Sequence, residues 1–123
     1  MSFEFSIDEE AGFPVVCPEG SLIEKHQAEE LLDEINEMLF EGSNRIIIDL
    51  SKLNYLNSSG LGVILSILTR TRKAGGEVVI SGVNDRLNNL IVITKLDAVF
   101  QFSKNRSEAA ERLKLTEHPN QKQ

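Results

Sequence analysis

Two short apolar runs limit what this chain can fold into more than any other feature of its sequence. Ile46-Ile47-Ile48 and Val78-Val79-Ile80 consist of β-branched residues with no polar interruption. Such runs are typical of strands whose two faces are both covered by helices. A helix is predicted between them, from Ser58 to about Ala74, because leucine and isoleucine recur there at helical spacing. A strand, a helix and a strand in this order predict neighbouring parallel strands joined by a right-handed crossover.

The rest of the chain continues this alternation. Phe3 to Ile7 alternate apolar with polar residues, as in a half-buried strand, and residues 14–18 can supply its hairpin partner. The other predicted elements are a helix over 25–40, a loop over 51–57, a helix over 84–94 capped by Asn84, a strand over 99–102 and a last helix capped by Ser107.

The predicted fold class is α/β, with a mostly parallel sheet of four to five strands. It includes an N-terminal hairpin strand, and about four helices cover the sheet. We expect a single domain over residues 1–116, because a chain of 123 residues suits one domain. Residues 117–123 are polar, contain Pro119 and are predicted to form a frayed tail.

The composition argues against several classes of function. Hydrophobic residues make up 41% of the chain and charged residues 26%, which suits a globular domain. The net charge of -6 argues against binding to nucleic acid or anionic lipid, both of which need clustered Lys and Arg. No apolar run approaches the roughly 20 residues that span a bilayer, and no secretion signal is visible. Cys17 is the only cysteine, so we expect no intrachain disulfide and a cytoplasmic protein.

One segment carries chemical content. The strand at 46–50 is followed by a loop that brings Asn57-Ser58-Ser59-Gly60 to the start of a helix. The first turn of a helix has N–H groups without intrahelical partners and a partial positive charge. The sequence leaves two interpretations of Ser58 open: it is an N-cap, worth about 1 kcal/mol, or it accepts a phosphate, an anion that helix N-termini bind well.

The same helix has an unusual first part. Gly60 and Gly62 each cost roughly 0.8–1.0 kcal/mol relative to alanine inside a helix. That cost makes sense where another surface approaches the backbone closely, either from a partner or from the sheet of the same domain. Val63 and Ile67 widen the apolar face of the helix, which predicts either deep burial or a docking patch.

A family resemblance is visible in this segment. Residues 49–65 read Asp-Leu-Ser-Lys-Leu-Asn-Tyr-Leu-Asn-Ser-Ser-Gly-Leu-Gly-Val-Ile-Leu. They resemble the signature of the STAS domain, which is named for sulphate transporters and anti-sigma factor antagonists. The soluble bacterial antagonists resemble the chain most. The likeness spans roughly residues 3–115, with supporting matches at Gly75-Gly76 and over 94–100.

The resemblance implies a partner-switching mechanism in transcription regulation and no enzymatic activity. The unphosphorylated antagonist would bind an anti-sigma factor that is also a serine kinase of the GHKL type. The kinase would phosphorylate Ser58, with Ser59 as second choice, and the complex would fall apart; a PP2C-type phosphatase would reset the cycle. The implied partner-binding residues are Ser21, Leu22, Glu24, Asn57, Ser59, Gly60 and Gly62.

The chain departs from the family pattern in two places. The family usually has Asp directly before the acceptor Ser, whereas this chain has Asn57, which keeps the size and an acceptor oxygen but loses the charge. The family also often has Gly-Glu-hydrophobic-Asp after the second strand. Here the sequence from Gly20 is Gly-Ser-Leu-Ile-Glu, and Glu24 can stand in for the acid.

Other hypotheses are an unphosphorylated adaptor subunit of a signalling or transport complex, and a nucleotide-binding module that uses the Ser58 helix start. His26 and His118 are isolated, so we expect neither a metal site nor a cofactor, and no catalytic residues. For oligomeric state, we expect a monomer or a weak dimer.

Overall fold

The structure, a computed structural model, describes residues 2–115. The predicted tail over 117–123 lies outside these residues. In chain order the elements are β1 (Phe3–Glu10), β2 (Phe13–Leu22), the 3-10 turn η1 (Lys25–Ala28), α1 (Glu29–Phe40), β3 (Arg45–Asp49), β4 (Leu53–Leu56), α2 (Ser58–Lys73), β5 (Glu77–Ser81), α3 (Asp85–Ile93), the 3-10 turn η2 (Leu96–Ala98), β6 (Gln101–Ser103) and α4 (Arg106–Leu115).

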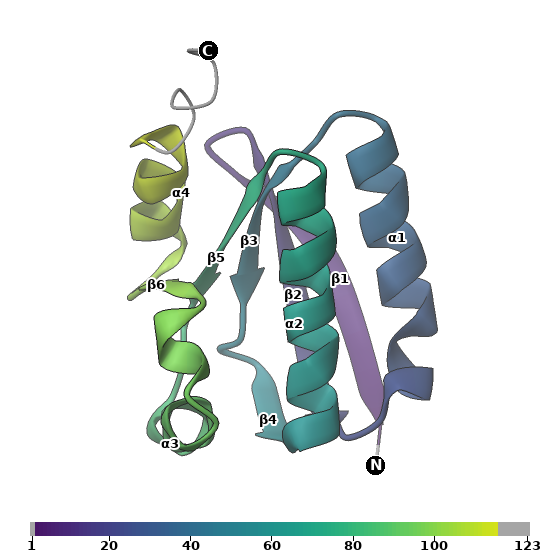
Figure 1. The fold of residues 1–123 in the computed structure, drawn as a ribbon, viewed down its shortest axis with the longest axis vertical. Coiled ribbons are helices and arrows are strands. Elements are labelled where there is room, and N and C mark those ends of the chain that lie inside the picture. Colours follow the sequence, from purple (N-terminus) through teal and green to yellow (C-terminus); the bar gives the residue numbers. More distant parts are fainter. Residues whose placement is uncertain (1, 116–123) are drawn as a thin grey trace.

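The strands form one mixed sheet in the order β1-β2-β3-β5-β6, and β4 pairs with the far end of β2. β1 and β2 form an antiparallel hairpin, whereas the other pairings in residues 2–115 are parallel. β3 lies at the centre, where Ile47 pairs with Val15 on one side and Val79 on the other. The mostly parallel sheet with an N-terminal hairpin is therefore confirmed, and Figure 1 shows the helices that cover it.

The two apolar runs are buried on both faces, as predicted. Ile46 and Ile48 belong to a large core cluster with side chains of α1, α2 and α3. Ile47 points to the other face, where it packs with Val79 and the inner side of α4. Successive side chains of a strand point to opposite faces. The unbroken apolar sequence therefore reflects two helical layers, and within residues 2–115 the second layer is α4.

The second strand is longer than predicted. It was predicted over residues 14–18, but β2 runs from Phe13 to Leu22, with a register shift between Gly20 and Ser21. Gly20 has φ +90°, and a Cβ there would collide with the backbone oxygen of Ser2. The glycine therefore allows the strand to bend from its pairing with β1 toward β4, instead of terminating it.

Two other local predictions are wrong. Residues 51–57 were expected to be a loop, but Leu53–Leu56 forms the strand β4. This strand pairs with the C-terminal end of β2. The last helix begins at Arg106, and its cap is Asn105, whose Oδ1 accepts a hydrogen bond from the Glu108 N–H at 2.9 Å.

Smaller differences concern element ends. The first turn of the helix expected over 25–40 is the 3-10 turn η1, and the last strand covers Gln101–Ser103, after η2. Asn84 caps α3 as predicted, with the Leu87 N–H donating to Oδ1 at 2.8 Å. No helix within residues 2–115 combines the length and apolarity that crossing a membrane requires.

Candidate functional site

The start of α2 is held by Asn57. Its backbone is extended (φ -110°, ψ -172°), and its Oδ1 accepts a hydrogen bond from the Gly60 N–H at 2.8 Å. Its carbonyl oxygen accepts the first helical bond, from the Leu61 N–H at 2.8 Å. Asn57 is therefore the N-cap, and the alternative in which Ser58 caps the helix is wrong. The capping oxygen of Asn57 would be equally present in an aspartate, so the exchange of Asp for Asn removes only the charge.

The hydroxyls of Ser58 and Ser59 face solvent at the first two positions of α2. Both residues are exposed. Neither side chain makes a hydrogen bond to any residue within 2–115. The first turn of α2 contains no acidic residue, so nothing within it offsets the partial positive charge of the helix N-terminus. The site thus presents two unengaged hydroxyls beside N–H groups that favour an anion.

The two glycines of α2 lie in different surroundings. A Cβ on Gly60 would collide with the backbone oxygen of Leu22 and would lie 2.8 Å from Cδ1 of Leu56. Gly60 therefore allows the helix to pack tightly on the ends of β2 and β4, which is the interpretation internal to the domain. A Cβ on Gly62 would meet nothing within 4 Å. Packing does not explain Gly62, which keeps the solvent-facing side of the first two turns flat.

The wide apolar face of α2 is internal. Val63 is 2% exposed and Ile67 is fully buried, and both belong to the core cluster. Of the two interpretations of this face, deep burial is confirmed for these two side chains.

The residues expected on the neighbouring loop divide into buried and exposed ones. Ser21 and Leu22 are the last residues of β2, where they pair with Tyr55 and Leu56 of β4, and both are buried. Leu22 has no exposed side-chain surface. Glu24 is exposed and lines a hollow of about 340 Å³ together with Ser59 and Gly62 of α2. The structure therefore brings Glu24, but not Leu22, onto the surface shared with Ser59.

Sequence reasoning missed Gln27, which holds the loop at this surface, and Tyr55, an exposed residue of the strand before α2. Gln27 fixes the loop: its Oε1 accepts from the N–H groups of Ile23 (2.8 Å) and Glu24 (3.1 Å), while Nε2 donates to the Ser21 carbonyl. The spacing of Glu24 and Gln27, which is that of a capping box, was the available signal. Tyr55 is 44% exposed on β4, three residues before Ser58 in the chain, where the sequence pattern predicted a loop.

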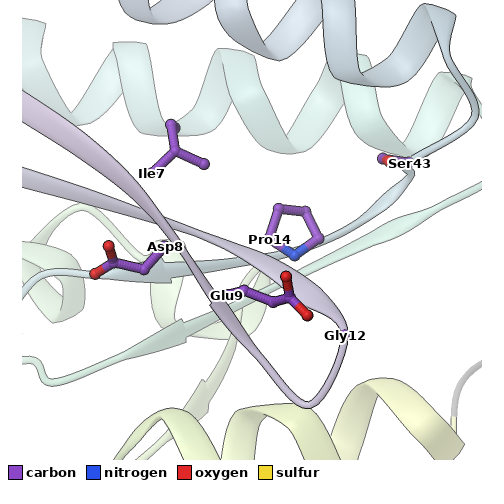
Figure 2. A pocket seen from close by; sticks show the side chains of 6 residues that line it. All are labelled: Ile7, Asp8, Glu9, Gly12, Pro14 and Ser43. Carbon is purple, nitrogen blue, oxygen red and sulfur yellow. The ribbon is translucent and has the colours of Figure 1, made fainter.

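Two other features of the described part of the chain lie outside this surface or are missing from it. No group of three or more His, Cys, Asp or Glu within residues 2–115 is placed to hold a metal ion. A hollow of about 490 Å³ lies at the hairpin end of the sheet. Figure 2 shows Ile7 and Pro14 of the hairpin and Ser43 of a nearby loop around it, with the carboxylate of Glu9 in front. It lies at the end of the sheet opposite to the start of α2 (Figure 1).

Comparisons with known proteins agree with the geometry. A family model for the STAS domain matches residues 5–109. BtrV of Bordetella bronchiseptica, named as a candidate anti-sigma factor antagonist, is 26% identical over 107 residues, which are 87% of this chain and 91% of BtrV.

Solved structures share the fold. The crystal structure of a candidate anti-sigma factor antagonist from Thermotoga maritima superimposes with a TM-score of 0.76 at 25% identity, covering 89% of this chain and 94% of that one. The phosphorylated form of the Bacillus cell fate determinant SpoIIAA superimposes with a TM-score of 0.67 at 20% identity, covering 89% and 98%. The chain therefore belongs to the STAS domain family.

Proposed function

We propose that the protein is an anti-sigma factor antagonist that binds its partner through the start of α2 and is released by phosphorylation of Ser58. The observation that carries the proposal is that Asn57 caps the helix, which leaves the exposed Ser58 hydroxyl without a structural task. The names of the family relatives support the antagonist function. That SpoIIAA, of the same fold, has a phosphorylated form supports a phosphate-controlled version of it.

Phosphorylation would act on this surface through charge and size. A phosphoserine adds about -1.5 to -2 charges and three acceptor oxygens. At the first position of α2 the helix N–H groups would stabilise it, so the modified protein would remain folded. The same group would stand beside the hollow lined by Ser59 and Gly62, where a partner surface would otherwise approach the flat start of the helix. Binding would weaken because an anion would have to be desolvated in the interface.

The partner would be an anti-sigma factor with serine kinase activity of the GHKL type, and a PP2C-type phosphatase would restore the unmodified form. The exposed residues around Ser58 would make the contact: Glu24, Ser59, Gly62 and Tyr55. Ser21, Leu22, Asn57 and Gly60 would shape this surface from beneath, since they position β4 and the helix start. This role is regulatory and would be carried out in the cytoplasm.

The test is to incubate the protein with its cognate kinase and ATP, followed by mass spectrometry of the peptides. We expect one phosphate on Ser58, none in Ser58→Ala, and an unchanged yield in Ser59→Ala, the matched control one position away. Calorimetry with the kinase should show binding by the wild type and by Ser58→Asn, and a loss of at least about tenfold for Ser58→Asp, since only the last adds charge. Absence of phosphate on Ser58 would defeat the proposal.

A second candidate is an adaptor that is not phosphorylated, favoured by Asn57. The capping hydrogen bond needs only an oxygen, so the family's Asp offers a charge that this chain lacks. If Ser58→Ala and Ser58→Asp both preserve the cellular function, this candidate replaces the first.

A further inference from the structure

A separate hollow lies on the other face of the sheet, which α4 covers. Its volume is about 400 Å³, and it is lined at the ends of β3 and β5 by Ser51, Ser81 and Gly82, and at the start of α4 by Lys104, Arg106 and Ser107. In parallel sheets, ligands bind outside the carboxyl ends of the strands. The proposed function does not use this hollow.

Polar side chains replace the apolar core at this level of the sheet. Ile47 and Val79 pack against α4, and two residues later the same strand faces carry Asp49 and Ser81, which pair with each other. Since side chains two residues apart share a face, Ser81 points to the side of the sheet where α4 begins. The hollow is therefore a polar end to the α4 layer.

Ser81 has no partner there. It is 1% exposed, and its Oγ is the one buried side-chain polar atom without a hydrogen bond among residues 2–115. Its neighbour on β6, Ser103, donates to the Asn105 carbonyl at 3.1 Å. A buried hydroxyl without a partner lowers stability. Because this atom lies in the wall of a hollow, a ligand in the hollow could supply the missing hydrogen bond.

The free groups of the hollow are mostly donors. Both oxygens of Asp49 are already used, one by the Ser51 N–H at 2.9 Å and the other by Arg106 Nε at 2.7 Å. The side chains of Lys104 and Ser107 have no partner within residues 2–115. The N–H groups of the first turn of α4, a helix of 10 residues, add a partial positive charge, which the carboxylate of Glu108 in the same turn partly offsets. A ligand that matches this set carries acceptor oxygens and negative charge.

We propose that this hollow binds the phosphate group of a small phosphorylated molecule, with Ser81, Lys104 and the start of α4 as donors. The volume leaves room for an organic group beside the phosphate. Glu10 also lines the hollow, and its carboxylate opposes an anion. The proposal is independent of Ser58, since the two sites lie on opposite faces of the sheet.

The test is a titration of the isotopically labelled full chain with inorganic phosphate, followed by NMR of the backbone amides. We expect the amides of Ser51, Gly82 and Ser107 to shift together. Ser81→Ala should weaken binding about three- to tenfold and Lys104→Gln about tenfold, because each removes a donor. Glu10→Gln should strengthen it. Lys114→Gln, the same charge change at the far end of α4, is the matched control and should leave the affinity unchanged.

A second measurement separates the ligand role from a structural one. If the Ser81 hydroxyl has no partner in the free protein, Ser81→Ala should melt at the same temperature as the wild type or higher. A clearly lower melting temperature would show that the hydroxyl already has a partner, such as a buried water, and would overturn the proposal. Phosphate that shifts none of these amides, or that binds Lys114→Gln as weakly as Lys104→Gln, would overturn it as well.

Discussion

The starts of α2 and α4 have the same type of cap, but the side chains that follow the cap differ. Each helix begins at the end of the sheet where β3 ends (Figure 1), and each is capped by an asparagine, Asn57 or Asn105, that accepts from the N–H three residues on. At α2 the next two side chains are free serines. At α4 the next side chain is Arg106, which is paired with Asp49 and Asp8. At α2 the side chains after the cap are free in solvent, whereas at α4 the side chain after the cap ties the helix to the sheet.

The charges around the two helix starts also differ. Burial raises the pKa of Asp49, but hydrogen bonds from Ser51 and Arg106 outweigh it and hold the pKa below its usual value. The carboxylates of Asp49 and Asp8 raise the pKa of Arg106, although its partial burial works against this. Burial and the nearby Asp49 raise the pKa of the Cys17 thiol, although the charge of Arg106 works against this. No acidic residue lies in the first turn of α2.

Removing Arg106 should have the largest effect. Arg106→Met leaves the carboxylate of Asp49 without its cation, and breaking buried pairs costs 3–5 kcal/mol. Because the Arg106 side chain is 28% exposed, we expect a smaller loss of about 2–3 kcal/mol in the free energy of unfolding. Urea denaturation measures it, with Arg112→Met on the same helix as control. Equal stability of the two variants would show that α4 is not tied by this pair.

The next effect concerns the start of α2. Gly60→Ala should lower the free energy of unfolding by about 1–3 kcal/mol, because its Cβ would collide with the Leu22 carbonyl. Gly62→Ala is the matched variant and should raise stability by about 0.5–1 kcal/mol, since its Cβ meets nothing. Denaturation of both variants gives the comparison. A destabilised Gly62→Ala would contradict the assignment of an open surface at that position.

The two caps allow a direct comparison. Asn57→Ala and Asn105→Ala should each cost about 1 kcal/mol, because each loses one bond to a helix N–H group. Asn57→Asp should retain that stability and tests the family's usual residue directly. If Asn57→Ala is neutral in thermal or urea unfolding, Asn57 does not hold the start of α2.

The smallest effect is a pH dependence confined to the tied helix. The folded-state pKa of Asp49 is lowered, so its stabilisation is fully present above the unfolded pKa of about 4 and is lost as the pH falls below it. The free energy of unfolding of the wild type should therefore fall more steeply below about pH 4 than that of Asp49→Asn. Parallel curves for the two proteins would mean that the pair is not formed.

Much of this architecture could be predicted from local patterns. The apolar runs at Ile46 and Val78 predicted buried parallel strands, and the helical spacing predicted α2 with the correct start at Ser58. The predictions failed where a distant segment decides the local structure. β4 has no alternating pattern, with Leu53 and Leu56 buried and two exposed residues between them, and it becomes a strand only because β2 offers it an edge.

The same distinction applies to the candidate site. The Asn-Ser-Ser-Gly motif and its place at a helix start were visible in the sequence. Which residue caps the helix was not, because adjacent Asn and Ser have similar capping preferences and only the backbone geometry separates them. Contacts between β2, β4 and α2 decide that Leu22 is buried and Tyr55 exposed. They also decide that Gly60, but not Gly62, leaves no space for a side chain.

The sequence by itself determined the fold class and the position of the Asn-Ser-Ser-Gly motif, because hydrophobic period and capping chemistry act over a few neighbouring residues. Only the tertiary structure decided which of these groups are accessible. It left Ser58 in solvent, enclosed Ser81 without a partner and placed Arg106 against Asp49, 57 residues away in the chain. Exposure and pairing depend on segments that are distant in sequence, and no local pattern records how those segments meet.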